Sequence, residues 1–271
     1  MKGTPVRPTD LEAVKRQQRA FYQANAKYYH LIDEQFQSGY TYDDILKELA
    51  GRLTAPVGFL DVGCGSGYYV LRARALGCMA TGIDLSLHSC HMGSKRVGGR
   101  FCQADAESLP FRDGCFGLVF CQQLIEHVVF PERVLAEIAR VLRPGGILFL
   151  SAPNRLGRRS APKIQRILRE LYAGTEVKRI VALPPDVLRR WSTSDDIDAL
   201  QDTDMCNETT VFQALRLVRQ VGLTVERFDT LRHARKYGRL AYLLARAASR
   251  LPLARYAGVN FKIVARKAGA P

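Results

Sequence analysis

A glycine-rich turn that follows a short apolar segment constrains the fold of this chain more than any other feature. The segment Gly58-Phe-Leu-Asp-Val62 has the pattern of a buried strand, and Gly63, Gly65 and Gly67 follow it. Glycine lets a ligand approach the backbone closely. Because a helix is expected from Tyr68, the turn also exposes N–H groups at a helix start. Strand, glycine turn and helix in this order predict a ligand site at the end of the strand.

Strand and helix patterns alternate along the rest of the chain. Besides the first strand, short apolar runs predict strands over 79–84, 100–103, 117–121, 147–151, 223–229 and 261–266. Helical periodicity covers 68–76, 131–142 and 208–221. Strands that alternate with helices form a parallel sheet with helices on both faces. We therefore expect an α/β fold with one doubly wound sheet.

The alternation also divides the chain into four parts. Residues 1–54 are expected to form a helical cap, and 55–154 the ligand-binding core. Residues 155–206 are basic, contain two adjacent prolines and lack a clear strand, so they are expected to be an insertion or lid. Strand and helix patterns return in residues 207–271, which are expected to complete the sheet.

Acidic residues end the next two strands and make the ligand more specific. The spacing G-x-G-x-x-G of dinucleotide enzymes would need a third glycine where Tyr68 stands. Asp84 ends the second strand, where a carboxylate can accept hydrogen bonds from both hydroxyls of a ribose. Asp105 follows the third strand and could accept from an adenine amino group. The alternative is that both acids only cap the helices that follow them.

At this point the chain resembles the class I S-adenosylmethionine-dependent methyltransferases. The closest likeness is to their type 11 group, which includes ubiquinone- and menaquinone-pathway enzymes. The motifs that carry it are Leu60–Gly67, Gly82–Leu85, Ala104–Phe111, Leu124–Val128 and Arg140–Gly146. The resemblance implies a Rossmann-like sheet of seven mostly parallel strands, ordered 3-2-1-4-5-7-6 with the last strand antiparallel. It is strong over 56–154 and weak over 208–266.

The resemblance also implies a set of residues that bind S-adenosylmethionine. They are Asp61, Gly63, Cys64, Gly65, Gly67, Asp84, Leu85, Asp105, Ala106 and Gln122. Within this set Asp61 would order the turn or meet the methionine ammonium group, and Asp84 would hold the ribose. Leu85 and Asp105 would lie at the adenine, and Gln122 near the transferring methyl. One departure is Gly117, where the family usually has aspartate.

The expected activity is methyl transfer to an oxygen, nitrogen or carbon of a small-molecule or lipid-linked acceptor. The protein must hold the two reactants together and exclude water. An oxygen or carbon acceptor usually also loses a proton. His127 is the histidine within a matched motif and is a weak candidate base; the alternative is that it anchors its loop. An RNA methyltransferase and a non-catalytic S-adenosylmethionine-binding protein are the other functions considered.

The net charge of +14 is concentrated in the second half of the chain. Residues 1–154 hold 17 basic and 15 acidic side chains, whereas 155–271 hold 23 and 11. Tyr237–Leu251 has an apolar stripe flanked by arginines, which could rest on an anionic bilayer. The plainer interpretation is a helix that covers the sheet. Because no RNA-binding module or interleaved aromatic residues appear, nucleic acid is an unlikely partner.

Three further expectations concern metal binding and location. The seven cysteines include no C-x-x-C pair, and His88 and His91 lack an evident third ligand, so no metal site is expected. The N-terminus lacks the apolar core of a signal peptide, and no apolar run is long enough to span a bilayer. We expect a cytoplasmic protein that could lie peripherally at the inner membrane surface.

Overall fold

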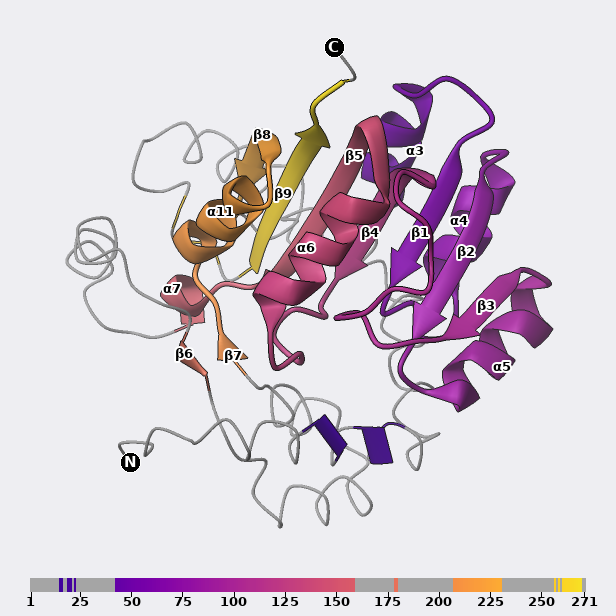
Figure 1. The fold of residues 1–271 in the computed structure, drawn as a ribbon, viewed down its shortest axis with the longest axis horizontal. Coiled ribbons are helices and arrows are strands. Elements are labelled where there is room, and N and C mark those ends of the chain that lie inside the picture. Colours follow the sequence, from indigo (N-terminus) through magenta and orange to yellow (C-terminus); the bar gives the residue numbers. More distant parts are fainter. Residues whose placement is uncertain are drawn as a thin grey trace, which may run out of the picture.

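The computed structural model places one central sheet between two layers of helices (Figure 1). It describes residues 42–158, 178–179, 207–230 and 260–269, together with positions 15, 16, 19, 20, 22, 256 and 258. The structural statements below concern these residues.

The sheet has seven strands in the order β3-β2-β1-β4-β5-β9-β8. β9 is antiparallel to both of its neighbours, while the other strand pairs are parallel. This confirms the order that the resemblance implied. The strands are β1 Gly58–Val62, β2 Met79–Asp84, β3 Arg100–Gln103, β4 Phe116–Gln122, β5 Leu142–Pro153, β8 Leu223–Asp229 and β9 Asn260–Lys267. A separate two-stranded sheet joins β6 Lys178–Arg179 to β7 Asn207–Glu208.

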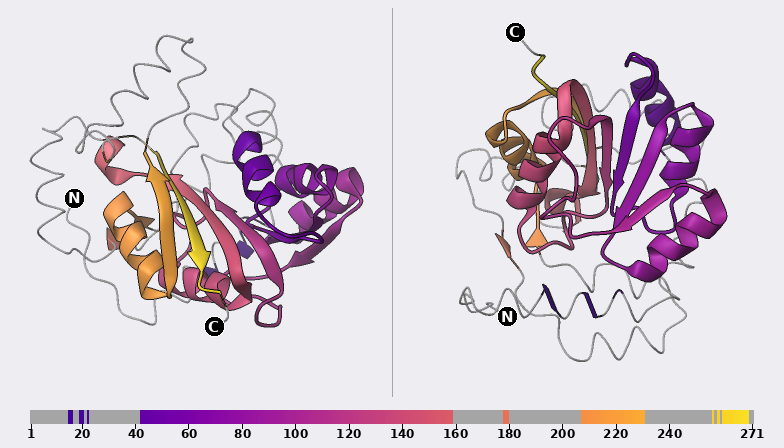
Figure 2. Two further views of the ribbon diagram at one scale, coloured as in Figure 1. Left: turned by 90° about the horizontal axis from the view of Figure 1, so that it is seen from above. Right: turned by 45° about the vertical axis from the view of Figure 1, so that its right-hand side comes forward.

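Helices cover both faces of the sheet (Figures 1 and 2). α3 Asp43–Gly51 and α4 Tyr68–Ala75 lie on one face, with α5 Leu87–Val97 packed against β2 and β3 next to α4. α6 Pro131–Val141 and α11 Val211–Gln220 lie on the other face, and α7 Arg155–Arg158 follows β5. The carboxyl ends of β1 to β5 all point to one edge of the sheet, the lower edge in Figure 1.

Two element boundaries differ from the sequence expectation by three residues or more. The helix expected over 208–221 starts at Val211, because Thr210 and Gln213 form a reciprocal capping box there. The residues before it, Asn207–Glu208, pair as β7 instead. The fifth strand begins at Leu142, five residues earlier than expected, because Leu142 already pairs with Phe116 of β4.

Several expected segments lie outside the described residues. They are most of the N-terminal cap, most of the insertion at 155–206, and the amphipathic segment Tyr237–Leu251. Their predicted roles therefore stay predictions. Among the helices that the structure describes, none combines the length and the apolar character needed to cross a bilayer.

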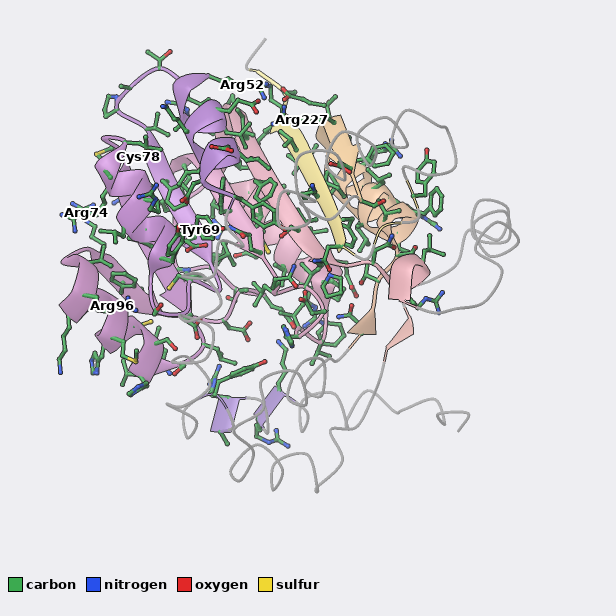
Figure 3. All side chains as sticks on the ribbon, turned by 180° about the vertical axis from the view of Figure 1, so that it is seen from behind. Arg52, Tyr69, Arg74, Cys78, Arg96 and Arg227 are labelled. Carbon is green, nitrogen blue, oxygen red and sulfur yellow. The ribbon has the colours of Figure 1, made fainter. Side chains whose placement is uncertain are left out.

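Ion pairs at the amino-end edge join α3 and the residue after it to β8. The Arg52 guanidinium lies 2.6 Å from the Glu226 carboxylate of β8, and Arg227 lies 2.7 Å from Glu48 of α3. Figure 3 shows the two arginines next to each other at this edge. Such exposed pairs contribute little stability singly. Their effect here is to fix α3 against strands that lie far from it in sequence.

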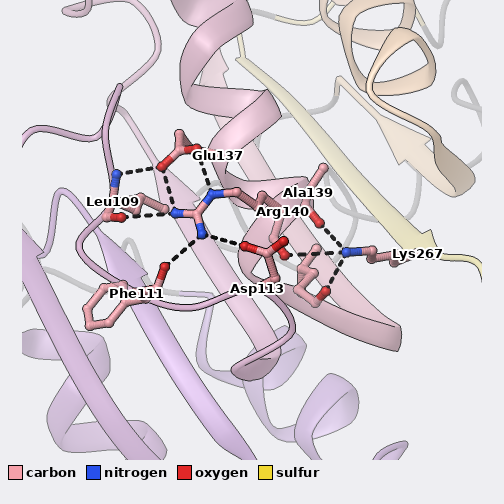
Figure 4. A network of polar contacts seen from close by, with 8 residues as sticks. Leu109, Phe111, Asp113, Glu137, Ala139, Arg140 and Lys267 are labelled. Atoms are coloured by element: carbon pink, nitrogen blue, oxygen red, sulfur yellow. Dashed lines mark hydrogen bonds and ion pairs between the residues drawn. The ribbon is translucent and has the colours of Figure 1, made fainter.

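Arg140 of α6 joins two of the matched motifs (Figure 4). Its guanidinium donates twice to the carboxylate of Glu137, once to Asp113 and once each to the carbonyl oxygens of Leu109 and Phe111. All five N–H donors of the side chain are used, and Glu137 in turn accepts from the Leu109 N–H at 2.7 Å. The loop after β3 is thereby tied to α6.

The missing aspartate at Gly117 has a local explanation. A Cβ atom at this position would lie 3.2 Å from Nε of Arg143 and 3.3 Å from its Cζ. The Arg143 guanidinium therefore lies against the bare backbone of β4, in the direction that a side chain at 117 would take. The departure from the family pattern changes the packing of this strand edge rather than the strand itself.

We predict that Arg140→Met lowers the free energy of unfolding by about 2 kcal/mol, because charged hydrogen bonds are lost and the Leu109 and Phe111 carbonyls lose a partner. Urea denaturation followed by circular dichroism measures this change. The matched control is Arg112→Met at an exposed position of the loop that Arg140 contacts, which should change stability by less than about 0.5 kcal/mol. Equal effects of the two substitutions would contradict the role of Arg140.

Candidate functional site

The glycine turn after β1 has the backbone that only glycine adopts easily. Gly63, Gly65 and Gly67 have φ angles of 75°, 50° and 86°. A Cβ on Gly67 would lie 2.6 Å from the ring of Phe101. The N–H groups of Gly63 and Cys64 both donate to the Ile83 carbonyl, at 2.9 and 2.8 Å. The turn is therefore held against β2, and its conformation forbids larger residues.

Asp84 at the end of β2 fixes this turn directly. Its Oδ2 accepts from the Gly65 N–H at 3.0 Å and its Oδ1 from the Ser86 N–H at 2.9 Å. α5 has its own cap, since Ser86 Oγ accepts from the Ser89 N–H. Asp84 therefore does more than cap a helix. Each carboxylate oxygen has a second lone pair that can accept from a hydroxyl group of a ligand.

Asp61 lies in β1, two residues before Gly63, and is 3% exposed. Burial, and secondly the nearby charge of Asp84, raise its pKa to about 8. A carboxyl group in these surroundings is stabilised in its charged form by a neighbouring cation. An ammonium or sulfonium group at the turn would supply that cation, so the donor set fits the cofactor that the sequence implied.

The third strand end carries the expected adenine residues. Asp105 Oδ1 accepts from the Glu107 N–H at 2.9 Å, which forms a local turn. Ala106 within this turn is buried. The Gln103 side chain donates to the Leu85 carbonyl at 3.0 Å, so the loop after β2 and the end of β3 are linked. Asp84 and Asp105 thus come from neighbouring strands at one edge, as predicted.

The end of β4 carries backbone strain next to the glycine turn. Gln122 is the last residue of the strand, and Gln123 has φ of 46°, the positive-φ residue other than glycine within the described chain. Its N–H donates to the Ser151 carbonyl of β5 at 2.8 Å. The next side chain, Leu124, lies 3.0 Å from where a Cβ on Gly63 would be. Residues in such backbone often cluster at functional sites.

Polar residues form a row across four strands at this edge. In the strand register Gln122 pairs with Ser151, Ser151 with Lys262, and Lys262 with Asp229. Lys262 is buried, and its ammonium lies 3.0 Å from the Asp229 carboxylate. One step further from this edge the row is apolar, with Phe120, Phe149 and Val264 in the core. The row therefore marks where the core ends and a polar site can begin.

Tyr42, just before α3, adds a phenol to this row. Its ring packs edge-to-face on Phe149 with centroids 5.0 Å apart, and the Tyr69 hydroxyl accepts from its N–H at 2.9 Å. Burial raises the pKa of Tyr42, and hydrogen bonding to Ser151 opposes this. The phenol therefore stays protonated at neutral pH and can donate. Figure 3 labels Tyr69 on the face formed by α3 and α4.

His127 lies in the loop after β4, beside Glu126. Its Nε2 is 3.7 Å from the Glu126 carboxylate. The backbone N–H of His127 donates to the Leu124 carbonyl at 2.8 Å. Glu126 is buried. The imidazole is thus held within the loop, in a position compatible with either anchoring or proton transfer, and its role stays a prediction.

Two buried asparagines that the sequence reasoning missed hold the loops around this edge. Asn207 Nδ2 donates to the carbonyls of Ile125 and Val128 at 2.6 and 2.8 Å, and so anchors the loop that carries His127. Asn154 Nδ2 donates to the carbonyls of Tyr256 and Gly258, while its Oδ1 accepts from Val211. Neither residue lies in a motif, and the partners of Asn207 are about 80 positions away.

Asp61 generates a prediction on pH dependence. Its folded pKa, about 8, lies above the ordinary value of 3.8, so folding favours the protonated form. Protonated Asp61 therefore makes its full contribution to the free energy of unfolding below pH 3.8, and this contribution is lost as pH rises through 8. The amide in Asp61→Asn does not titrate, so the variant does not show this loss. Between pH 5 and 8 the free energy of unfolding of the variant should therefore rise relative to wild type, with a slope approaching about 1.4 kcal/mol per pH unit.

Urea denaturation at a series of pH values, without added ligand, measures that slope. Asp44→Asn, at an exposed acid of α3, is the matched control and should give a difference that does not change with pH over this range. A constant difference for Asp61→Asn as well would contradict the raised pKa.

Comparison with known proteins agrees with this geometry. Residues 60–150 match the methyltransferase-domain family of type 11. A norajmaline N-methyltransferase of Rauvolfia serpentina is 30% identical over 195 residues, which is 67% of this chain and 64% of that protein. A ubiquinone biosynthesis O-methyltransferase of Leptothrix cholodnii is 30% identical over 150 residues, covering 51% and 63%. The chain thus spans somewhat less than two thirds of these relatives.

A solved structure extends the likeness to nearly the whole chain. The 1,6-didemethyltoxoflavin-N1-methyltransferase of Burkholderia thailandensis, with bound 1,6-didemethyltoxoflavin and S-adenosylhomocysteine, aligns with a TM-score of 0.57. It covers 99% of this chain and 93% of its own, at 16% identity, so the likeness concerns the fold. With the family match over residues 60–150, which run from β1 into β5, the chain carries a methyltransferase domain of the type 11 family.

Proposed function

We propose that this protein transfers a methyl group from S-adenosylmethionine to a small-molecule acceptor. The observation that carries the proposal is the coupling of Asp84 to Gly65. It sets a ribose-binding carboxylate and a glycine turn at one sheet edge, inside the segment that matches the methyltransferase family.

The cofactor side of the proposed site uses residues from three strand ends. Asp84 would accept hydrogen bonds from the ribose hydroxyls, beside the backbone N–H groups of Gly65 and Ser86 that it already accepts from. Asp61 would ionise against the positive charge of the cofactor. Asp105 and Ala106 would meet the adenine. When bound, the sulfonium group supplies an electrophilic methyl.

The acceptor side would be the polar row that begins at Gln122. Ser151, Lys262 and the Tyr42 phenol would orient polar groups of the acceptor, and the core beneath them would exclude water. Lys262 lies two strands from Gln122, so a group bound there would be about 10 Å from the methyl-transfer position. For an oxygen or carbon acceptor, His127 beside Glu126 is the candidate to take the proton.

The small-molecule class of acceptor is supported by the relatives. Their names specify norajmaline and ubiquinone biosynthesis, and the similar structure holds 1,6-didemethyltoxoflavin. The acceptor atom differs among them, so the choice among oxygen, nitrogen and carbon needs direct measurement. A fold of this kind can also serve without catalysis, so binding and turnover are separate tests.

Membrane or RNA contact concerns the basic second half of the chain. Flotation with anionic and neutral liposomes tests the first, and RNA gel shifts at stated salt concentrations test the second. Binding to anionic liposomes alone would favour a lipid-linked acceptor, and RNA binding would favour an RNA substrate.

We predict that the wild-type protein binds S-adenosylmethionine and S-adenosylhomocysteine in calorimetry. Asp84→Asn should weaken both by about 10- to 100-fold, because a charged hydrogen-bond acceptor is lost and an amide presents N–H groups to the Gly65 N–H and the ribose. Asp44→Asn on α3 is the matched control and should bind like wild type. Failure of the wild type to bind either compound would refute the proposed function.

Turnover is measured with methyl-labelled S-adenosylmethionine and a panel of phenols, amines and quinone precursors. Label transfer to one chemical class identifies the acceptor atom. Fractions of a cell extract are tested as acceptors in the same way. Binding of S-adenosylmethionine without label transfer to any compound or fraction would favour the non-catalytic alternative.

A further inference from the structure

Lys15, from the N-terminal region, lies at the proposed adenine rim. Its ammonium is 2.5 Å from Oε2 of Glu107 and 3.4 Å from Oδ2 of Asp105. It also lies 5.7 Å from the centroid of the Phe130 ring, at the start of α6. One cation therefore meets the turn after β3 and the beginning of α6, from a residue about 90 positions earlier in the chain.

Glu107 makes this contact costly to lose. Its side chain is 4% exposed, and its Oε1 accepts from the Phe130 N–H at 3.0 Å. Within the described part of the chain, the other cation within 4 Å of Glu107 is Arg133, which is 3.9 Å away and 57% exposed, with its guanidinium over the Phe130 ring. A buried carboxylate without a close cation is strongly destabilised. Lys15 is therefore the close counter-charge that the structure gives to Glu107.

The same pair bears on Asp105. The Glu107 N–H donates to Asp105 Oδ1, which leaves Oδ2 directed to Lys15 at 3.4 Å. The Asp105 side chain is 31% exposed, so Oδ2 still has room for a second donor. An adenine amino group is such a donor. Lys15 thus helps to orient the carboxylate that would recognise the base.

We propose that Lys15 is a positioning residue of the cofactor site. It acts through Glu107 to hold the Asp105–Glu107 turn in its adenine-binding geometry, and the same ion pair attaches Lys15 itself to the adenine rim. Cofactor binding and this attachment are then coupled. Because coupling is reciprocal, the cofactor must strengthen the attachment by the same factor as the attachment strengthens the cofactor. The inference rests on the proposed function, since it needs an adenine in the site.

The test compares Lys15→Met, which keeps the length of the side chain but removes its charge, with Lys15→Arg and with Lys47→Met on exposed α3 as the matched control. Calorimetry with S-adenosylhomocysteine should show about tenfold weaker binding for Lys15→Met. Lys15→Arg should retain most of the affinity and Lys47→Met all of it. In the double variant with Glu107→Gln, the two losses should not add, because the buried charge disappears with its partner.

Trypsin cleavage after the exposed Arg19 reports the attachment itself. S-Adenosylhomocysteine should slow this cleavage in wild type and in Lys15→Arg, and leave it unchanged in Lys15→Met. A structural role alone would lower the urea midpoint of Lys15→Met without changing affinity or protection, and that result would overturn the inference. If the wild type fails to bind S-adenosylhomocysteine, the proposed function fails. If the wild type binds it and Lys15→Met binds it equally well, only the inference fails.

Discussion

The hydrogen bonds of Asp84 are the interaction on which the proposed site depends. They tie the end of β2 to the glycine turn after β1, so that two loops at the carboxyl edge have one shared geometry. The turn can take that geometry because its three glycines adopt positive φ, and the strained residue Gln123 brings the loop after β4 against Gly63. Asp61 is buried near Asp84, and both effects raise its pKa, so a nearby cation would favour its ionised form. A cationic, ribose-bearing cofactor satisfies both conditions.

Polar side chains that bond to backbone carbonyl groups hold the remaining loops. Asn207 anchors the loop with His127, Asn154 joins β5 to α11, and Arg140 ties the loop after β3 to α6. Buried polar groups that satisfy backbone carbonyls fix a conformation strongly, since leaving these groups unpaired is costly. The loops of the site are therefore ordered by contacts that lie beside the chemistry, not within it.

The proposed cofactor side and the proposed acceptor side differ in how many of their residues lie within the matched family segment. The cofactor side is built from strand ends and turns that belong to the matched family segment. The acceptor side adds Tyr42, Lys262 and Asp229, which lie outside that segment. A shared cofactor end with individual acceptor residues is the expected division in a fold that serves many substrates.

The sequence by itself determined the strands, most of the helices, and the glycines and acids at the strand ends. These follow from local patterns: a period of two or 3.6 residues, glycines where positive φ is needed, and acids that end successive strands. The strand order came from the family resemblance. Only the tertiary structure decided that Asn207 holds the His127 loop, that Arg143 lies against Gly117, that Asp61 has a raised pKa and that Lys15 meets Glu107. The physical reason is that hydrogen bonding, ion pairing and desolvation depend on distances between residues far apart in the chain, and a local pattern does not specify those distances.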